Sequence, residues 1–380
     1  MIQSTSYLCT TMFIIVGAIF YAQRFSVART LGPALLSIIS GIVLSNSGIL
    51  PQWHDVYGVV ISSVLPLSLA LFMLSINLAD IKRLSGKPLL AMTISIGTVS
   101  VMGSIGALVF HDKIPEIYKF TGMFIGTYTG GSANLAAVGV AVNASPEQLA
   151  QANGADYIVG MPVLILFYLI PRLIIQSSHF STWYPYQLKL NHPDHKKESL
   201  FKKIEWSISD IAILMALAFS LVTLSDWIAQ FVSKDLQKTV MILTLTTLAL
   251  ILGQFQVIKK LKGSVDLGIY LYAFFLLVIG SLVDIQKFFS GIPSVAAYCG
   301  WVIFGSLIVY IIICRLIKIP LEYLVIAYVA SIADGTTSAV VAASNQWRSL
   351  ISLAILLGMI GATIGSYIGI AIAWQVYNLG

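Results

Sequence analysis

Long apolar segments are the feature of this sequence that most limits what it can fold into. Stretches of about 17–25 mostly apolar residues can cross the hydrocarbon core of a membrane as helices. Twelve such segments can be marked, and all 22 Lys and Arg residues fall between them or at their ends. The segments cover approximately residues 7–22, 30–48, 56–78, 88–110, 119–143, 147–175, 208–232, 239–256, 266–285, 294–314, 321–343 and 349–377.

The charge content agrees with a membrane location. Only 10% of the residues are charged and 58% are apolar, whereas a soluble domain has about 25% charged residues. This excludes a soluble enzyme, a nucleic-acid-binding domain and a disordered chain. We therefore expect an all-α polytopic protein of the bacterial cytoplasmic (inner) membrane, because a membrane β-barrel would show weak alternating segments instead. The residues before the first segment hold no Lys or Arg, so no cleaved signal peptide is expected.

The chain contains an internal repeat. The Leu, Asp and Ile of residues 78–81 recur in residues 282–285, and the Lys-Ile-Pro of residues 113–115 recurs in residues 318–320. Both matches have an offset of about 204 residues. Repeats of this kind are common in secondary transporters, which place their binding site near the bilayer midplane between the repeats. We expect a first transmembrane repeat, a polar linker and a second transmembrane repeat over residues 1–175, 176–207 and 208–380.

The distribution of Lys and Arg favours inverted repeats. The connectors that are rich in positive charge in the first half match connectors that are poorer in the second half, and the reverse also holds. Opposite bias in matching loops is what inverted repeats show. Six crossings in each half would instead give parallel repeats, because inversion needs an odd number. We therefore expect ten to twelve transmembrane helices, with one segment re-entrant, interfacial or miscounted.

Two segments carry polar residues where apolar ones are expected. Residues 126–134 read GTYTGGSAN, and the repeat-related residues 334–338 read DGTTS. Each glycine costs a helix interior about 1 kcal/mol relative to alanine, so a broken helix is predicted in each repeat. Such a break is tolerated at membrane depth where it lines a cavity or is buried in protein, and the half-helix ends carry partial charges suited to an ion. The alternative is close helix packing through Gly122, Gly126 and Gly130.

Two acidic residues are the leading candidates within the membrane. Asp334 lies in mid-segment, where an Asp costs at least about 2.5–3.5 kcal/mol and usually marks an ion pathway. The alternative role for Asp334 is to cap the following half-helix. The sequence Ser-Pro-Glu-Gln at residues 145–148 predicts a capped helix start, which places Asp156 about 15 Å along the helix, with Asn153 on the same face. The alternative is a looser loop with Asp156 near the interface.

These observations predict one ion or substrate site. It contains Gly126, Thr127, Thr129, Gly130, Gly131, Ser132, Asn134, Asn153, Asp156, Asp334, Gly335, Thr336, Thr337 and Ser338. If Na⁺ binds, Asp156 and Asp334 are the carboxylates expected to hold it. No cofactor is expected other than Na⁺ or H⁺ as a coupling ion. No hydrolase elbow, phosphate-binding loop or zinc-protease motif is present, so no enzyme activity is expected.

The segments GTYTGGSANLAAVGVA (126–141) and SIADGTTSAVVAA (331–343) resemble the YjcL-like family of membrane proteins of unknown function. The resemblance covers nearly the whole chain. More distantly, the paired broken helices with carboxylates resemble the superfamily of sodium/proton antiporters and of bile-acid and glutamate symporters. Antiporters of that group carry an Asn-Asp or Asp-Asp pair after the first broken helix. Here Asn153 and Asp156 are not adjacent, a departure that puts antiport in doubt. The resemblance also implies a core domain that moves against a scaffold or dimerisation domain.

We therefore expect a cation-coupled (Na⁺ or H⁺) secondary transporter of a small solute, with alternating access around the broken helices. The alternatives are a cation/proton antiporter without organic solute and a non-transporting membrane sensor or scaffold. The expected partners are the lipid bilayer and a small-molecule or ion substrate, and a homodimer is compatible with this architecture. No nucleic-acid partner is expected.

Overall fold

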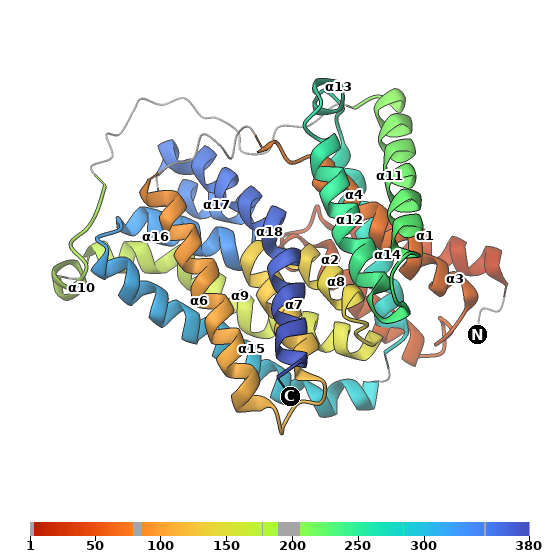
Figure 1. Cartoon of the computed structure of the whole chain (residues 1–380), viewed down its shortest axis with the longest axis horizontal. Helices are drawn as coiled ribbons and strands as arrows, with labels where there is room; N and C mark the ends of the chain where they lie inside the picture. The colour runs from red at the N-terminus through yellow and green to blue at the C-terminus, as the bar shows by residue number, and fades with distance from the viewer. Residues whose placement is uncertain are drawn as a thin grey trace. The chain divides into compact units, whose positions relative to one another are not determined.

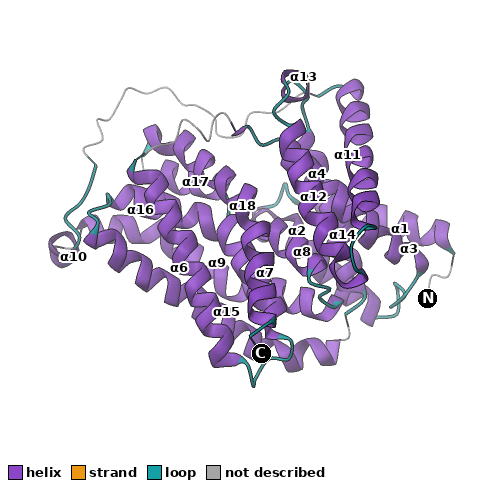
Figure 2. Ribbon diagram, in the orientation of Figure 1, coloured by secondary structure: helices purple, strands orange, loops and turns teal. Residues whose placement is uncertain are grey.

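Helices make up all the regular structure in the described part of the chain. The computed structural model describes residues 4–78, 86–176, 178–188, 206–283, 285–345 and 347–379. Within these ranges Figure 2 shows helices joined by loops and no strand. Seven of the described helices are long and apolar enough to cross a membrane. The prediction of an all-helical chain with membrane-length helices is therefore confirmed.

Each expected apolar segment corresponds to one observed helix or to a run of consecutive helical elements. Two of them, residues 119–143 and 321–343, are each occupied by two consecutive helices. How many helices cross a membrane, and the orientation of the repeats, stay predictions. The longer helices are α1 (Thr5–Ala22), α2 (Ser26–Asn46), α4 (Leu65–Leu74), α6 (Lys87–Phe110), α7 (Ile117–Gly130), α8 (Ser132–Ala141), α9 (Pro146–Gln176), α11 (Ile208–Ala229), α12 (Gln237–Leu252), α14 (Ser264–Ser281), α15 (Ile285–Leu316), α16 (Leu321–Ile332), α17 (Gly335–Ser344) and α18 (Ile351–Tyr377).

Short elements join these helices. A π-helix, η1, leads from α3 into α4, and two 3-10 turns precede α12 and α18. The short elements are α3 (Asp55–Val59), η1 (Val60–Val64), α10 (Ser178–Trp183), η2 (Lys234–Leu236), α13 (Gln256–Lys259) and η3 (Arg348–Leu350). Most of the expected polar linker, and the repeat-matched Asp80 and Asp284, lie outside the described residues.

The chain forms two compact units, each built from segments of both sequence halves. Unit 1 comprises residues 1–76, 139–157 and 205–295, and unit 2 comprises residues 77–138, 158–204 and 296–380. Helices α8, α9 and α15 each begin in one unit and end in the other. The two units therefore do not coincide with the two halves of the sequence.

In unit 1, α14 packs against α2 and α4. The contact with α2 is close because glycines face each other: a Cβ on Gly41 would overlap the Leu277 carbonyl oxygen, and one on Gly280 would overlap that of Ile38. At the other contact the Ser264 hydroxyl donates to the Leu71 carbonyl oxygen over 2.6 Å. These contacts bury most of α14 from Tyr272 to Ser281. Helix α14 is thus the core element of unit 1.

In unit 2, α7 and α16 are the buried helices. Every residue of α7 except Tyr118, and every residue of α16 except Tyr323, is buried. Helix α18 lies along α7, as Figure 1 shows, and α6 packs against both α7 and α16. The Tyr298 hydroxyl of α15 ties two of these helices together, because it lies 2.9 Å from the Gly103 carbonyl oxygen and 2.8 Å from the Thr121 hydroxyl.

Candidate functional site

The first helix interruption in unit 2 is made by one glycine. Helix α7 ends at Gly130, α8 begins at Ser132, and Gly131 between them has φ 95° and ψ 168°. Side-chain-bearing residues rarely adopt this φ, whereas glycine does so without a steric penalty. The Gly131 N–H still donates to the Thr127 carbonyl oxygen over 2.7 Å. The chain therefore changes direction within a single residue, in the segment where the sequence predicted a break.

The second interruption is built differently. Helix α16 ends at Ile332, Ala333 has φ −122° and ψ −91°, and α17 begins at Gly335. The Asp334 carboxylate accepts hydrogen bonds from the Thr337 backbone N–H and the Thr337 hydroxyl, both over 2.8 Å. This is helix N-capping by an aspartate side chain, the alternative role weighed for Asp334. The Asp334 side chain is also exposed, so capping leaves it accessible.

The two interruptions meet in space. A Cβ placed on Gly131 would lie 2.6 Å from the Ala333 carbonyl oxygen and 3.9 Å from the Asp334 Cβ. One turn before the breaks, the Ser331 hydroxyl donates to the Tyr128 carbonyl oxygen over 2.5 Å. We call residues 128–132 and 331–335 the crossover. It brings two helix C-terminal ends and two helix N-terminal ends together in unit 2, with Tyr128 to Gly131 buried and Asp334 exposed.

A seam of glycines on α18 supports the crossover. Gly122 meets Gly369, Gly126 meets Gly365 and Gly130 meets Gly361, so the two helices run antiparallel in a fixed register. A Cβ on Gly361 would overlap the Thr129 carbonyl oxygen, which shows how closely the backbones approach. The packing role proposed for the α7 glycines is therefore confirmed.

The same seam reaches the second interruption. A Cβ on Gly358 would overlap the backbone nitrogen and Cα of Gly335. Helix α18 thus contacts both breaks with glycines on successive turns. These α18 glycines were not among the residues predicted from the sequence, although Gly361, Gly365 and Gly369 have the same spacing of four as their partners on α7. This shared spacing is the sequence feature from which the α18 glycines could have been predicted.

One hydroxyl at the crossover is buried without a hydrogen-bond partner. The Thr129 side chain is 0% exposed, and its Oγ1 has no partner within the described part of the chain. Leaving a buried hydroxyl unsatisfied costs about 1–3 kcal/mol. Buried polar groups are normally hydrogen-bonded, so an exception calls for an explanation such as a bound water or an ion. Thr129 Oγ1 is therefore the strongest single candidate for an ion ligand at the crossover.

The other predicted residues of unit 2 differ in burial and in hydrogen bonding. Thr127 and Asn134 are buried, Ser132 is half-buried, and Thr337 holds the Asp334 cap. The Ser338 hydroxyl is used structurally, because it donates to the Ile326 carbonyl oxygen over 2.7 Å and so ties α17 back to α16. The side chain of Thr336 lies outside the described part of the structure.

Asn153 and Asp156 belong to unit 1. Helix α9 begins at Pro146, with the Gln148 N–H donating to Ser145 Oγ and the Ser145 N–H to Gln148 Oε1, so the predicted capped start is confirmed. Asn153 is buried and donates to the Leu149 carbonyl oxygen of its own helix over 2.8 Å, and Asp156 is half-buried. The crossover as described in unit 2 is formed without these two residues, and their part in a common site stays a prediction.

The ligands available at the crossover are oxygens. Among the described residues there is no group of three or more His, Cys, Asp or Glu side chains that could hold a metal ion. What the crossover offers is the Thr129 hydroxyl, backbone carbonyls at the ends of α7 and α16, and the Asp334 carboxylate. Hydroxyl, carbonyl and carboxylate oxygens suit hard cations rather than soft transition metals.

Comparison with known proteins places the chain in a family. Residues 10–379 match the family described as "Protein of unknown function (DUF819)", and the chain belongs to this family. It is 28% identical over 359 residues to the uncharacterized membrane protein YjcL of Bacillus subtilis (strain 168), an alignment that covers 91% of this chain and 90% of the relative. Together with the membrane-length helices, these matches show an integral membrane protein and confirm the resemblance found in the sequence.

Proposed function

We propose that this protein is a cation-coupled secondary transporter of a small solute, with the crossover as its ion-binding site. One observation carries the proposal: two interrupted helices meet at their interruptions, and the adjacent Thr129 has a buried hydroxyl with no hydrogen-bond partner among the described residues. In a purely structural crossing, packing would favour an apolar side chain at position 129, because an unsatisfied buried hydroxyl is destabilising. A bound cation would remove that penalty.

The helix ends supply the electrostatic part of the site. The C-terminal ends of α7 and α16 carry partial negative charge and the N-terminal ends of α8 and α17 carry partial positive charge. A cation is stabilised by the carbonyl ends, and the Asp334 carboxylate lies at the start of α17. Broken helices whose ends face an ion near the bilayer midplane are a recurring plan in secondary transporters. The crossover has the parts that this plan requires.

Alternating access would follow from charge neutralisation. A carboxylate is costly to move through hydrocarbon, and a bound cation lowers the net charge that moves with it. We infer that the ion-bound crossover is the form that changes its side of exposure, and that solute binding is coupled to ion binding in this way. Asp156 of unit 1 is the second carboxylate that we propose to take part.

The test is flux measurement in reconstituted liposomes. Uptake of candidate solutes, including amino acids and short peptides, would be followed under an imposed Na⁺ gradient and, separately, under a pH gradient. Thr129→Val removes the hydroxyl and keeps the shape, and it should abolish ion-driven flux. Ser225→Ala is the matched control, because Ser225 Oγ is also buried without a partner in the described residues but lies on α11 of unit 1. Unchanged flux in Thr129→Val and in Asp334→Ala would sink the assignment.

The same preparation separates the rival functions. An antiporter would release protons from loaded liposomes when Na⁺ is added, with no dependence on any organic solute. A sensor or scaffold would show no flux in either gradient, and its unfolding temperature would not respond to Na⁺. A coupled transporter should instead show an Na⁺-dependent or pH-dependent uptake together with stabilisation by the coupling ion.

A further inference from the structure

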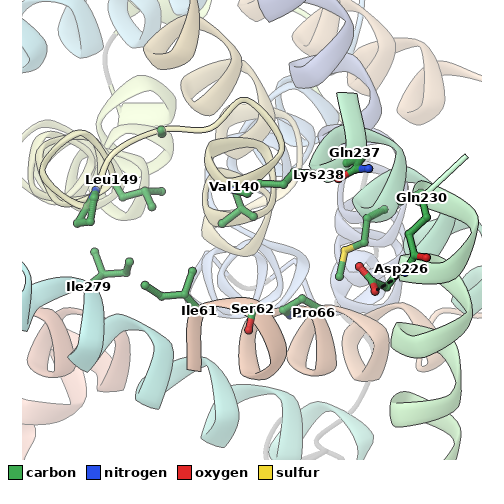
Figure 3. Close-up of a pocket in the computed structure, with 14 residues that line it drawn as sticks. Ile61, Ser62, Pro66, Val140, Leu149, Asp226, Gln230, Gln237, Lys238 and Ile279 are labelled. Carbon is green, nitrogen blue, oxygen red and sulfur yellow. Dashed lines mark hydrogen bonds between the residues drawn. The ribbon is translucent and has the colours of Figure 1, made fainter. Parts of the chain in front are cut away.

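Unit 1 contains a cavity that the proposed transport mechanism does not use. Its volume is about 420 Å³, within the range of sites for small molecules. Apolar side chains such as Ile61, Val140, Leu149 and Ile279 form much of its wall. Figure 3 shows Leu149 and Ile279 at one end of the cavity, Ser62 between the ends, and Asp226, Gln230 and Gln237 at the opposite end. The cavity therefore has an apolar end and a polar end.

A π-helix forms part of the wall. Residues Ile61 and Ser62 line the cavity from η1, and Pro66 lines it from the start of α4. Proline has no N–H with which to bond the carbonyl of Ser62 four residues earlier, and the backbone before it widens into i→i+5 geometry. Short π-helices are frequent at functional sites, because the widening re-aims groups that a regular helix would not present. The sequence thus builds an irregular wall at this cavity.

Two opposite charges stand at the polar end. Asp226 comes from the last turn of α11, and Lys238 from the first turn of α12. These helices pack side by side in unit 1 (Figure 1). Among the described residues neither charge has an ion-pair partner, and the Asp226 carboxylate accepts a single long hydrogen bond of 3.4 Å from the Gln230 side-chain amide. Both residues are exposed and line the cavity, so their charges are available to a ligand.

The helix ends reinforce this separation of charge. The carbonyl end of α11 carries partial negative charge beside Asp226, and the N–H end of α12 carries partial positive charge beside Lys238. An ammonium group is therefore favoured at the Asp226 side and an anionic group at the Lys238 side. The apolar wall, including Met241 and Leu149, would cover the rest of the ligand.

We propose that this cavity binds an amphipathic zwitterion, a molecule with an ammonium and an anionic group at one end of an apolar body. The site is separate from the crossover and does not depend on the transport proposal, because all its lining residues belong to unit 1. This chemistry is shared by apolar free amino acids such as leucine and by the headgroup end of zwitterionic lipids such as phosphatidylethanolamine. The experiment below distinguishes these two sources.

The test is photo-cross-linking of the full-length protein in a non-ionic detergent. The probe is the diazirine analogue of leucine, and the cross-linked peptides are identified by mass spectrometry. We expect labels on the cavity segments, in particular around Ile61 and Met241. Competition is then measured with leucine, with 3-methylbutylamine, which lacks the anion, with 4-methylpentanoate, which lacks the ammonium, and with a short-chain phosphatidylethanolamine.

Substitutions at Asp226 and Lys238 test which group of the ligand each charge binds. Asp226→Asn and Lys238→Gln should each raise the dissociation constant for the zwitterion by roughly tenfold or more, since each removes a bond to a charged group. Lys234→Gln is the matched control, because Lys234 is exposed in η2, one turn before Lys238, but does not line the cavity. Asp226→Asn should weaken competition by the amine and leave competition by the carboxylate unchanged.

The order of competition identifies the source of the ligand, and the labelled positions test the proposal itself. Competition by leucine at lower concentration than by phosphatidylethanolamine supports the free amino acid as the source, and the reverse order supports the lipid. Labels that avoid the cavity segments, or that persist undiminished in both Asp226→Asn and Lys238→Gln, would overturn the proposal. Because the labels are mapped by position, leucine bound at the crossover would be seen there and would not be mistaken for cavity binding.

Discussion

The two helix interruptions of unit 2 are held by different physical means. The first relies on steric freedom, since Gly131 has a φ of 95° and a backbone oxygen lies where its Cβ would be. The second relies on hydrogen bonding, since the Asp334 side chain caps α17 through Thr337. The position of Gly131 tolerates no added atom, whereas position 334 tolerates any side chain that can accept the same hydrogen bonds from Thr337. The two interruptions should therefore respond differently to substitution.

The largest effect is expected at the steric interruption. Gly131→Ala adds a Cβ that meets the Ala333 carbonyl oxygen at 2.6 Å and forces a positive φ on alanine, so it should destabilise the protein by about 3 kcal/mol. The measurement is thermal unfolding in detergent. Gly97→Ala is the control, because Gly97 lies in α6 of the same unit with nothing within 4 Å, and it should be neutral or slightly stabilising. Equal losses in both variants would contradict the steric account.

The next effect is expected at the glycine seam that both interruptions share. The added Cβ of Gly361→Ala would overlap backbone atoms at the first interruption, and that of Gly358→Ala would overlap backbone atoms at the second. Each variant should destabilise the protein by about 2 kcal/mol through overpacking. The double variant should lose less than the two single losses together, because one outward shift of α18 relieves both contacts. Unfolding of the three variants checks this. Strict additivity would indicate that α18 does not act as a common support.

A smaller effect is expected at the capping interruption. Asp334→Ala removes the acceptor for the Thr337 N–H and should destabilise by about 1 kcal/mol. Asp334→Asn keeps an acceptor oxygen and should be nearly as stable as the wild type, yet under our functional proposal it should lose ion-driven flux because the charge is gone. Unfolding and liposome flux measured on both variants separate the two roles. If Asp334→Asn transports normally, the carboxylate serves only as a cap.

The smallest effect on stability is expected between the interruptions. Thr129→Val replaces a buried, unpartnered hydroxyl by a methyl group, so the protein should be as stable as the wild type or more stable by up to about 1 kcal/mol. Flux should nevertheless fall. Ser225→Ala should show the same neutral or positive change in stability with normal flux. A marked loss of stability in Thr129→Val would mean that the hydroxyl has a structural partner after all.

The local features of the candidate site could be predicted from the sequence. The run GTYTGGSAN placed the first break in the right segment, and the Ser-Pro-Glu-Gln sequence gave the start of α9 at Pro146. The capping role of Asp334 was one of two readings, and the structure shows that bond directly. Each of these depends on residues within four positions of one another, where turn chemistry and capping act.

The long-range features could not be predicted in the same way. Nothing in the sequence near Gly131 indicates that its neighbour is Ala333, or that Gly361 of α18 lies against Thr129. Asn153 and Asp156 belong to unit 1, so their predicted place in one site with the crossover residues stays a prediction. Such pairings depend on how several helices close around one another, which periodicity does not encode.

The sequence by itself determined that this chain is built of membrane-length helices and where most of them begin and end. The physical reason is that the hydrocarbon core sets the length of a spanning helix and excludes charged residues. Length and low charge can therefore be read from each segment by itself. Only the tertiary structure decided that the two breaks meet and that glycines of α18 hold them, as it decided that Asp226 and Lys238 share a cavity. These features depend on contacts between segments far apart in the sequence, which pair according to the complementary shapes of their surfaces.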